Sequence, residues 1–204
     1  MQGGRDHWTG VYEEKSPTDV SWYQPEPKSS LRALDRFGAR SSASFIDVGG
    51  GASTLVDALL DSGWRDVTVL DIAASALKAA KDRLGEHAAK VHWEVADITQ
   101  WQPSRRYDVW HDRAVFHFLT QREQRTTYIR QVTSAVKPGG HILIGTFGLE
   151  GPERCSGLDV MRYDAESLHR EFGSSFHLLE SFHELHETPF GTTQQFLYCS
   201  FVRA

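Results

Sequence analysis

A regular alternation of short apolar segments with amphipathic segments is the feature that most constrains the fold of this chain. Runs typical of buried strands occupy residues 44–48, 67–71, 91–95, 107–111 and 141–147. Segments with helical spacing lie between them, including the alanine-rich stretch 73–84 and the long stretch 120–136. Strands that alternate with helices are joined by right-handed crossovers and form a parallel sheet covered on both faces. The pattern therefore predicts an α/β fold.

The end of the chain departs from this alternation. After a helical segment near 164–172, two further strand-like runs cover residues 176–186 and 195–202. The segment between these two runs is too short for a helical crossover, so they are expected to form an antiparallel hairpin. The complete prediction is a Rossmann-like, doubly wound, seven-stranded sheet, mostly parallel, with a C-terminal antiparallel hairpin.

The N-terminal part is interpreted as an irregular segment that packs on this sheet. Residues 1–27 are polar but carry Trp8, Tyr12, Trp22 and Tyr23, whereas disordered tails are poor in aromatic residues. A short helix is expected from about residue 29 to residue 37. With no repeat or linker in the sequence, we predict one domain over residues 1–204, with residues 1–38 as its N-terminal segment.

Composition excludes several classes of function. The formal net charge is −5, and no dense basic surface is indicated, which argues against nucleic acid as a partner. The two cysteines have no zinc-type spacing, and His183 and His186 fall on opposite faces of a strand, so no metal site is expected. No apolar run approaches the ~20 residues that span a bilayer, and no secretory signal is apparent; a cytoplasmic location is the resulting expectation.

A glycine loop and three acidic residues suggest where a ligand binds. Ligands of open parallel sheets bind beyond the carboxyl ends of the strands, at the point where strand order reverses. The first strand runs through Asp47 into Gly49, Gly50 and Gly51, and glycines let a backbone approach a ligand closely. Asp71 ends the second strand, and Asp97 follows the third.

Two cofactor classes can use this layout. A dinucleotide site usually carries G-x-G-x-x-G, but Thr54 stands at the third glycine position, and Asp47 would repel a pyrophosphate. The same carboxylate suits the ammonium group of S-adenosylmethionine (SAM), which has no phosphate. Asp71 is then suited to ribose hydroxyls and Asp97 to the adenine amino group. Ile72 and Ile98 would pack on the adenine faces.

The pattern resembles the class I SAM-dependent methyltransferases over about residues 44–202. The resemblance rests on DVGGGAS at 47–53, Asp71, VADI at 95–98, YDVW at 107–110 and KPGG at 137–140. In this family a final hairpin adds an antiparallel strand to the sheet, as predicted here. The glycine loop of the family often reads D-x-G-x-G-x-G, and Ser53 occupies the last position in this chain. The resemblance implies an enzyme that transfers a methyl group from SAM.

The resemblance also suggests which residues border the acceptor. His111 or Asp112 can take a proton and Arg113 can hold an anion; alternatively, Asp112 and Arg113 form an ion pair that shapes their loop. Trp8, Tyr12 and Trp22 resemble the N-terminal lid of small methyltransferases, and aromatic faces attract cations. Ordinary packing is the alternative for this segment. Cys155, in the loop after the fifth parallel strand, is interpreted as a packing residue.

We predict a small-molecule acceptor, with a protein lysine as the alternative because the N-terminal segment also resembles lysine methyltransferases. The remaining hypotheses are a NAD-dependent oxidoreductase and an inactive SAM-binding protein. The residues themselves do not specify the acceptor atom.

Overall fold

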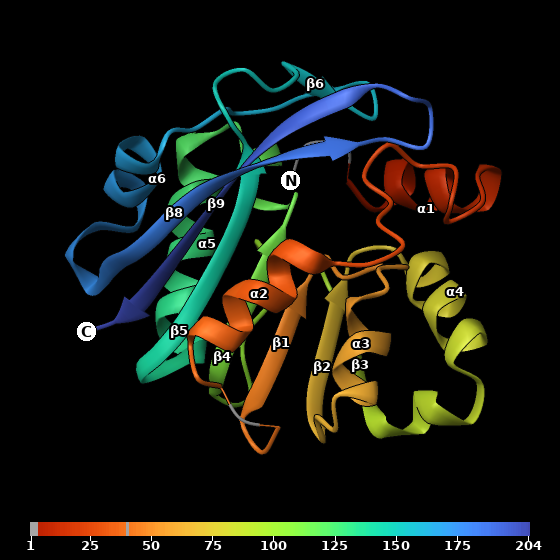
Figure 1. Ribbon diagram of the computed structural model, residues 1–204, viewed down its shortest axis with the longest axis horizontal. Helices are drawn as coiled ribbons and strands as arrows, with labels where there is room; N and C mark the ends of the chain where they lie inside the picture. The colour runs from red at the N-terminus through yellow and green to blue at the C-terminus, as the bar shows by residue number, and fades with distance from the viewer. Residues whose placement is uncertain (1–3, 40) are drawn as a thin grey trace.

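The computed structural model describes residues 4–39 and 41–204, which form a seven-stranded sheet flanked by helices (Figure 1). The sheet comprises β1 (Ser44–Val48), β2 (Asp66–Asp71), β3 (Val91–Val95), β4 (Tyr107–Arg113), β5 (Val136–Phe147), β8 (Phe176–Glu187) and β9 (Thr193–Arg203). Its order is β3-β2-β1-β4-β5-β9-β8. Neighbours from β3 to β5 are parallel, whereas β9 is antiparallel to both β5 and β8. The predicted fold, including the C-terminal hairpin, is confirmed.

Helices cover both faces of the sheet, as expected for a doubly wound fold. They are α2 (Lys28–Arg36), α3 (Leu55–Asp61), α4 (Ala74–Leu84), α5 (Arg122–Ala135) and α6 (Ala165–Phe172). Apolar residues of α2, α3 and α4 pack with Phe45 and Val67 on one face. Residues of α5 and α6 pack with Ile46 and Ile142 on the other. Every residue of β1 is buried, because a central parallel strand is covered on both sides.

Short elements complete the chain. The 3-10 turns are η1 (Gly85–Lys90), η2 (Phe116–Phe118) and η3 (Gly173–Ser175). The long loop after β5 contains a small hairpin of β6 (Arg154–Cys155) and β7 (Leu158–Asp159). Because β1 is followed by β2 on one side and bordered by β4 on the other, strand order reverses at the carboxyl end of β1.

The prediction of an irregular N-terminal segment is wrong for much of its length, since α1 (Gly4–Glu14) is helical; residues 1–3 lie outside the described part. Trp8, Val11 and Tyr12 are spaced three and four residues apart, so they share one helix face. Trp8 is 8% exposed and packs on Phe118, with ring centroids 5.0 Å apart. Tertiary packing therefore stabilises this helix, which was not predicted because the segment is polar overall.

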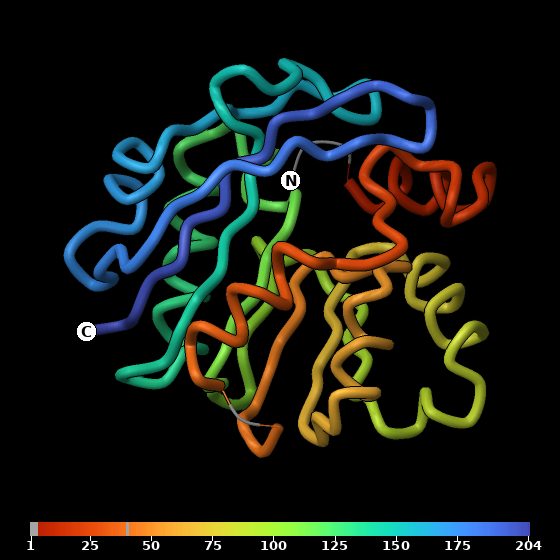
Figure 2. Tube along the Cα trace, viewed as in Figure 1, coloured from red at the N-terminus to blue at the C-terminus, as the bar shows by residue number. Residues whose placement is uncertain are grey.

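The N-terminal segment crosses above the strand tips, between α4 and the turn of the β8–β9 hairpin (Figure 2). His186 of β8 bonds to the carbonyl of Ser21 at 2.8 Å, and Gln24 donates to Glu184 at 2.7 Å. The hydroxyl of Ser75 in α4 donates to the carbonyl of Thr9 at 3.4 Å. These contacts fix residues close to the N-terminus against parts of the sheet that follow much later in the chain.

The start of β5 also differs from the prediction, which placed a turn at residues 137–140 and the strand from 141. Helix α5 ends at Ala135, and β5 begins at Val136, with a shift in pairing between Tyr107 and Val109 of β4. Lys137 Nζ lies 2.8 Å and 2.9 Å from the two carboxylate oxygens of Asp108. This ion pair holds the irregular stretch beside β4, so the chain bulges there without leaving the sheet.

Candidate functional site

The glycine loop after β1 is packed so closely that side chains have no room. Gly49 has a φ of 68°, and a Cβ atom there would overlap the Val115 side chain. Gly51 has a φ of 47°, and a Cβ there would lie 3.0 Å from an Asp71 oxygen and 3.1 Å from the Tyr12 hydroxyl. The left-handed backbone and the close approach both require glycine. The loop therefore brings bare backbone to the sheet edge beside Asp71.

Asp71 is a buried carboxylate at the end of β2, 7% exposed. Its Oδ1 atom accepts a hydrogen bond from the backbone N–H of Ala73 at 2.8 Å. Burial, and to a smaller extent the nearby Asp47 carboxylate, raises the pKa of Asp71 to about 7. A buried carboxyl group with a raised pKa at a cavity wall is a strong candidate for ligand binding.

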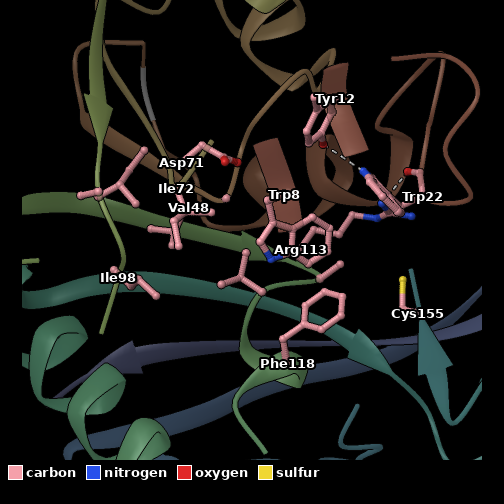
Figure 3. Close-up of a pocket in the computed structure, with 15 residues that line it drawn as sticks. Trp8, Tyr12, Trp22, Val48, Asp71, Ile72, Ile98, Arg113, Phe118 and Cys155 are labelled. Atoms are coloured by element: carbon pink, nitrogen blue, oxygen red, sulfur yellow. Dashed lines mark hydrogen bonds between the residues drawn. The ribbon is translucent and has the colours of Figure 1, made fainter. Parts of the chain in front are cut away.

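A cavity with an empty volume of about 600 Å³ opens at this edge. Val48, Asp71, Ile72 and Ile98 lie together on one side of it (Figure 3). The opposite side carries aromatic, sulfur and cationic side chains, namely Trp8, Tyr12, Trp22, Phe118, Cys155 and Arg113. The cavity thus has an acidic, aliphatic end and an aromatic, cationic end.

The structure brings most of the predicted cofactor-binding residues to this cavity, including Asp71, Ile72, Ile98 and the N-terminal aromatics. Asp97 is placed differently, because its Oδ1 accepts from the backbone N–H and the hydroxyl of Thr99 at 2.9 Å and 2.7 Å. These bonds cap the turn after β3. The role of Asp97 at an adenine amino group stays a prediction.

Asp47 belongs to a buried chain of three polar side chains. Asp47 Oδ1 lies 2.7 Å from His111 Nδ1, and His111 Nε2 lies 2.8 Å from the hydroxyl of Ser30 in α2. All three line a second cavity of about 560 Å³, which shares Tyr12, Trp22, Gly49 and Arg113 with the first. The three side chains therefore form one continuous hydrogen-bonded series from Asp47 to Ser30. Ser30 was not anticipated, because its sequence position shows only a helix start.

The Asp112 side chain forms its hydrogen bonds inside the protein and lines neither of these two cavities. It accepts hydrogen bonds from the Tyr128 hydroxyl at 2.5 Å and from the backbone N–H groups of Val115 and Phe116 at 2.9 Å and 3.1 Å. Its pKa is raised by burial to about 6. The alternative ion pair between Asp112 and Arg113 is not formed. These contacts support a structural role for Asp112, although it was a predicted catalytic candidate.

Arg113 points instead into the space between the two cavities. Its Nε donates to the Tyr198 hydroxyl at 2.9 Å, and one terminal nitrogen donates to the Trp22 carbonyl at 2.9 Å. The guanidinium carbon lies 4.3 Å from the centroid of the Phe196 ring. The next residue, Ala114, has a φ of 70°, a conformation that is strained for a residue other than glycine. No local sequence signal marks this strain, yet Ala114 and Val115 line the first cavity.

The predicted lid residues form one aromatic layer over the first cavity. Trp22 Nε1 donates to the Tyr12 hydroxyl at 3.2 Å, and the rings of Trp8 and Trp22 lie 5.9 Å apart. Phe118 of η2 extends this layer, and the sequence had not singled it out. Cys155 of β6 is 5% exposed and lines the cavity, so it is a buried packing residue that also forms part of the cavity wall.

Within the described residues, no group of three or more side chains is arranged to bind a metal ion. A search of the same residues finds no helix with the length and apolarity to span a bilayer.

The fold and the cavity together define a Rossmann-like α/β protein with a cavity at its switch point, where ligands of this architecture bind. A family described as "Methyltransferase domain" matches residues 45–140. This match covers a little under half of the chain and supports the resemblance to class I SAM-dependent methyltransferases that the sequence motifs indicate.

Individual relatives are distant. Malonyl-[acyl-carrier protein] O-methyltransferase 2 of Ilyobacter polytropus is 27% identical over 106 residues, which are 52% of this chain and 39% of that protein. Human EEF1A lysine methyltransferase 2 is 23% identical over 193 residues, covering 87% of this chain and 76% of the relative. The structure of Burkholderia thailandensis 1,6-didemethyltoxoflavin-N1-methyltransferase, with 1,6-didemethyltoxoflavin and S-adenosylhomocysteine bound, has a TM-score of 0.73 at 17% identity. That match covers 98% of this chain and 87% of the other.

Proposed function

We propose that this protein transfers the methyl group of SAM to a small-molecule acceptor. The observation that carries this proposal is the buried Asp71 carboxylate at the end of β2, beside the glycine loop and an aliphatic cavity wall. Asp71 would hold the ribose hydroxyls, with Ile72 and Ile98 against the adenine. Gly49 and Gly51 let the loop backbone pass close to the cavity wall, since a Cβ atom at either position would crowd Val115 or Asp71 and Tyr12.

A dinucleotide fits these residues poorly. A pyrophosphate at the glycine loop would face the buried Asp47 carboxylate, and desolvated like charges repel strongly. A donor with a sulfonium and an ammonium group meets attraction at the same place. This electrostatic difference favours SAM over NAD and argues against the oxidoreductase reading.

The residues of this chain would contribute alignment and exclusion of water. SAM supplies a methyl group activated by its positively charged sulfur. The aromatic layer of Trp8, Tyr12 and Trp22 would cover the cavity and exclude water from it. The positive φ of Ala114 shapes the backbone of the segment that forms part of the cavity wall. Ser30 and His111 would serve as a proton relay only for an acceptor group that reaches the second cavity, which both residues line.

A small-molecule acceptor is favoured because the N-terminal segment and the β6–β7 loop both cover the site. Cys155 of that loop and Trp8 of α1 line the same cavity. A protein lysine is the second candidate, and the similarity to human EEF1A lysine methyltransferase 2 supports it. Incubation of the protein with methyl-labelled SAM and fractionated cell extract separates the two. Label in the low-molecular-weight fraction supports the proposal, whereas label in a protein band supports the alternative.

Substitution of Asp71 tests the donor site. We expect Asp71→Ala to weaken SAM binding more than tenfold, or by about 1.4 kcal/mol or more, because hydrogen bonds to a charged group contribute about 1.5–3 kcal/mol. Isothermal titration calorimetry with SAM and S-adenosylhomocysteine measures this change. Asp61→Asn, at an exposed position of α3, is the matched control and should bind as the unmodified chain does. Equal affinities for all three proteins would remove the ribose assignment.

The raised pKa of Asp71 predicts that nucleoside affinity depends on pH. Ribose hydroxyls donate to the ionised carboxylate, so binding favours loss of a proton from a group whose pKa is about 7 in the free protein. Affinity should therefore rise roughly tenfold as pH increases from 6 to 8, because the Asp71 carboxyl group changes from mostly protonated to mostly ionised over this range. 5′-Methylthioadenosine is the appropriate probe because it lacks the α-amino group that titrates in the same range. Asp71→Asn should bind this nucleoside equally at both pH values; a persistent slope would assign the effect to another group.

A further inference from the structure

Arg113 carries a buried hydrogen-bonding group with no partner in the protein. Two of its three guanidinium nitrogens are bonded, to Tyr198 and to Trp22, but the remaining terminal nitrogen is buried and unbonded. None of the ion pairs between described residues includes Arg113. The residue as a whole is only partly buried, but a buried donor nitrogen without a partner is unfavourable, so this nitrogen is expected to meet an acceptor in a ligand.

The surroundings hold this side chain in place. Gly145 of β5 pairs with both Arg113 and Tyr198, and a Cβ there would lie 3.3 Å from Arg113 Cγ and 3.1 Å from the Tyr198 ring. The glycine therefore lets the arginine stem and the tyrosine ring pack against the strand. With the Phe196 ring under the guanidinium, the orientation of the charged group is set before a ligand binds.

No carboxylate of the described chain neutralises this charge directly. Asp112 is turned toward Tyr128. Glu184 is bonded to Gln24 and forms no direct ion pair with Arg113, although both charged groups lie close enough to the Tyr198 hydroxyl to shift its pKa in opposite directions. The charge is felt nearby, because Arg113 contributes to lowering the pKa values of His117 and His186, although burial is the larger cause for both. A positive region is thus built into the wall of the site.

We propose that Arg113 binds a carboxylate of the methyl acceptor and that the acceptor is a small molecule with an apolar or aromatic body and one such group. This inference rests on the proposed function. The guanidinium lies beside Trp22, across the cavity from Asp71 and Ile98 (Figure 3). The rings of Trp8, Trp22 and Phe118 supply the apolar surface for the body of the acceptor.

A carboxylate can also come from the amino-acid tail of SAM, and a first titration distinguishes the two sources. S-adenosylhomocysteine, which has this tail, and 5′-methylthioadenosine, which lacks it, are titrated into the unmodified protein, Arg113→Lys and Arg113→Met. We expect both ligands to keep their affinities within about threefold in all three proteins. A loss of tenfold or more for S-adenosylhomocysteine alone would assign Arg113 to the donor and overturn the inference.

A second titration tests the acceptor class. With S-adenosylhomocysteine at saturation, phenylacetate, indole-3-acetate and hexanoate are compared with their uncharged amides by ligand-observed NMR. We expect at least one acid to bind ten times or more tightly than its amide, Arg113→Met to abolish this preference, and Arg113→Lys to retain part of it. Equal binding of acids and amides, or no binding of any acid, would refute the proposal that Arg113 binds a carboxylate of the acceptor.

The two failures can be told apart. If the unmodified protein does not bind S-adenosylhomocysteine, the proposed function itself is wrong. If it binds S-adenosylhomocysteine but shows no preference for carboxylates, only the inference about Arg113 is wrong. Thermal unfolding of each variant shows whether it is folded, and Arg113→Lys, which keeps the charge and the stem, provides a usable variant if Arg113→Met does not fold.

Discussion

Gly49→Ala is expected to weaken S-adenosylhomocysteine binding at least 100-fold and to lower the free energy of unfolding by about 3 kcal/mol. The added Cβ would overlap the Val115 side chain, so either the glycine loop or the segment after β4 must move. Overpacking of a tight site typically costs about 1–3 kcal/mol, and the left-handed backbone adds about 1–2 kcal/mol for alanine. Both displaced segments line the cavities, so binding suffers as well as stability.

Two further variants separate overlap from backbone strain. Gly63→Ala, after α3, places alanine at a φ of 83° with no atom within 4 Å of its Cβ. It should lose about 1 kcal/mol of stability and no affinity. The double variant Gly49→Ala/Val115→Ala removes the overlapping methyl groups and should recover at least tenfold of the lost affinity. Calorimetric titration and thermal unfolding measure these effects; a Gly49→Ala protein that binds normally would show that the loop is not part of the donor site.

Asp112→Ala is expected to destabilise the protein by about 3–5 kcal/mol. The substitution leaves the Tyr128 hydroxyl and the N–H groups of Val115 and Phe116 without their acceptor in a fully buried position. Each unsatisfied buried group costs about 1–3 kcal/mol. For a chain of this size the midpoint of thermal unfolding should fall by roughly 10 °C.

The controls for Asp112 decide between a structural and a catalytic role. Tyr128→Phe leaves the carboxylate bonded to both backbone groups but deprives the buried Trp110 Nε1 donor of its acceptor, so it should lose about 2 kcal/mol. Asp112→Asn keeps an acceptor for the N–H groups and should fall between the two. If Asp112→Ala unfolds at the same temperature as the unmodified protein but has lost methyl-transfer activity, the result would support a catalytic role for Asp112.

The sheet was predictable because burial imposes simple periodicities on the sequence. Strands covered on both faces read as continuous apolar runs, and residues 44–48 and 67–71 show this pattern directly. The length of the segment between β8 and β9 identified the hairpin. Helix α1 escaped because its stability comes from Trp8 on Phe118, a contact between residues far apart in the chain.

Within the site, the sequence by itself determined which kinds of residue stand at the strand ends. Asp47, Asp71 and the three glycines follow from chain order alone, because parallel strands end at a common edge. Only the tertiary structure decided what these side chains and their neighbours do. Asp47 binds His111, Asp112 binds Tyr128, and Arg113 keeps an unbonded nitrogen at the cavity wall. The physical reason is that the partners of a buried polar group are chosen by packing between distant segments, which local sequence patterns do not encode.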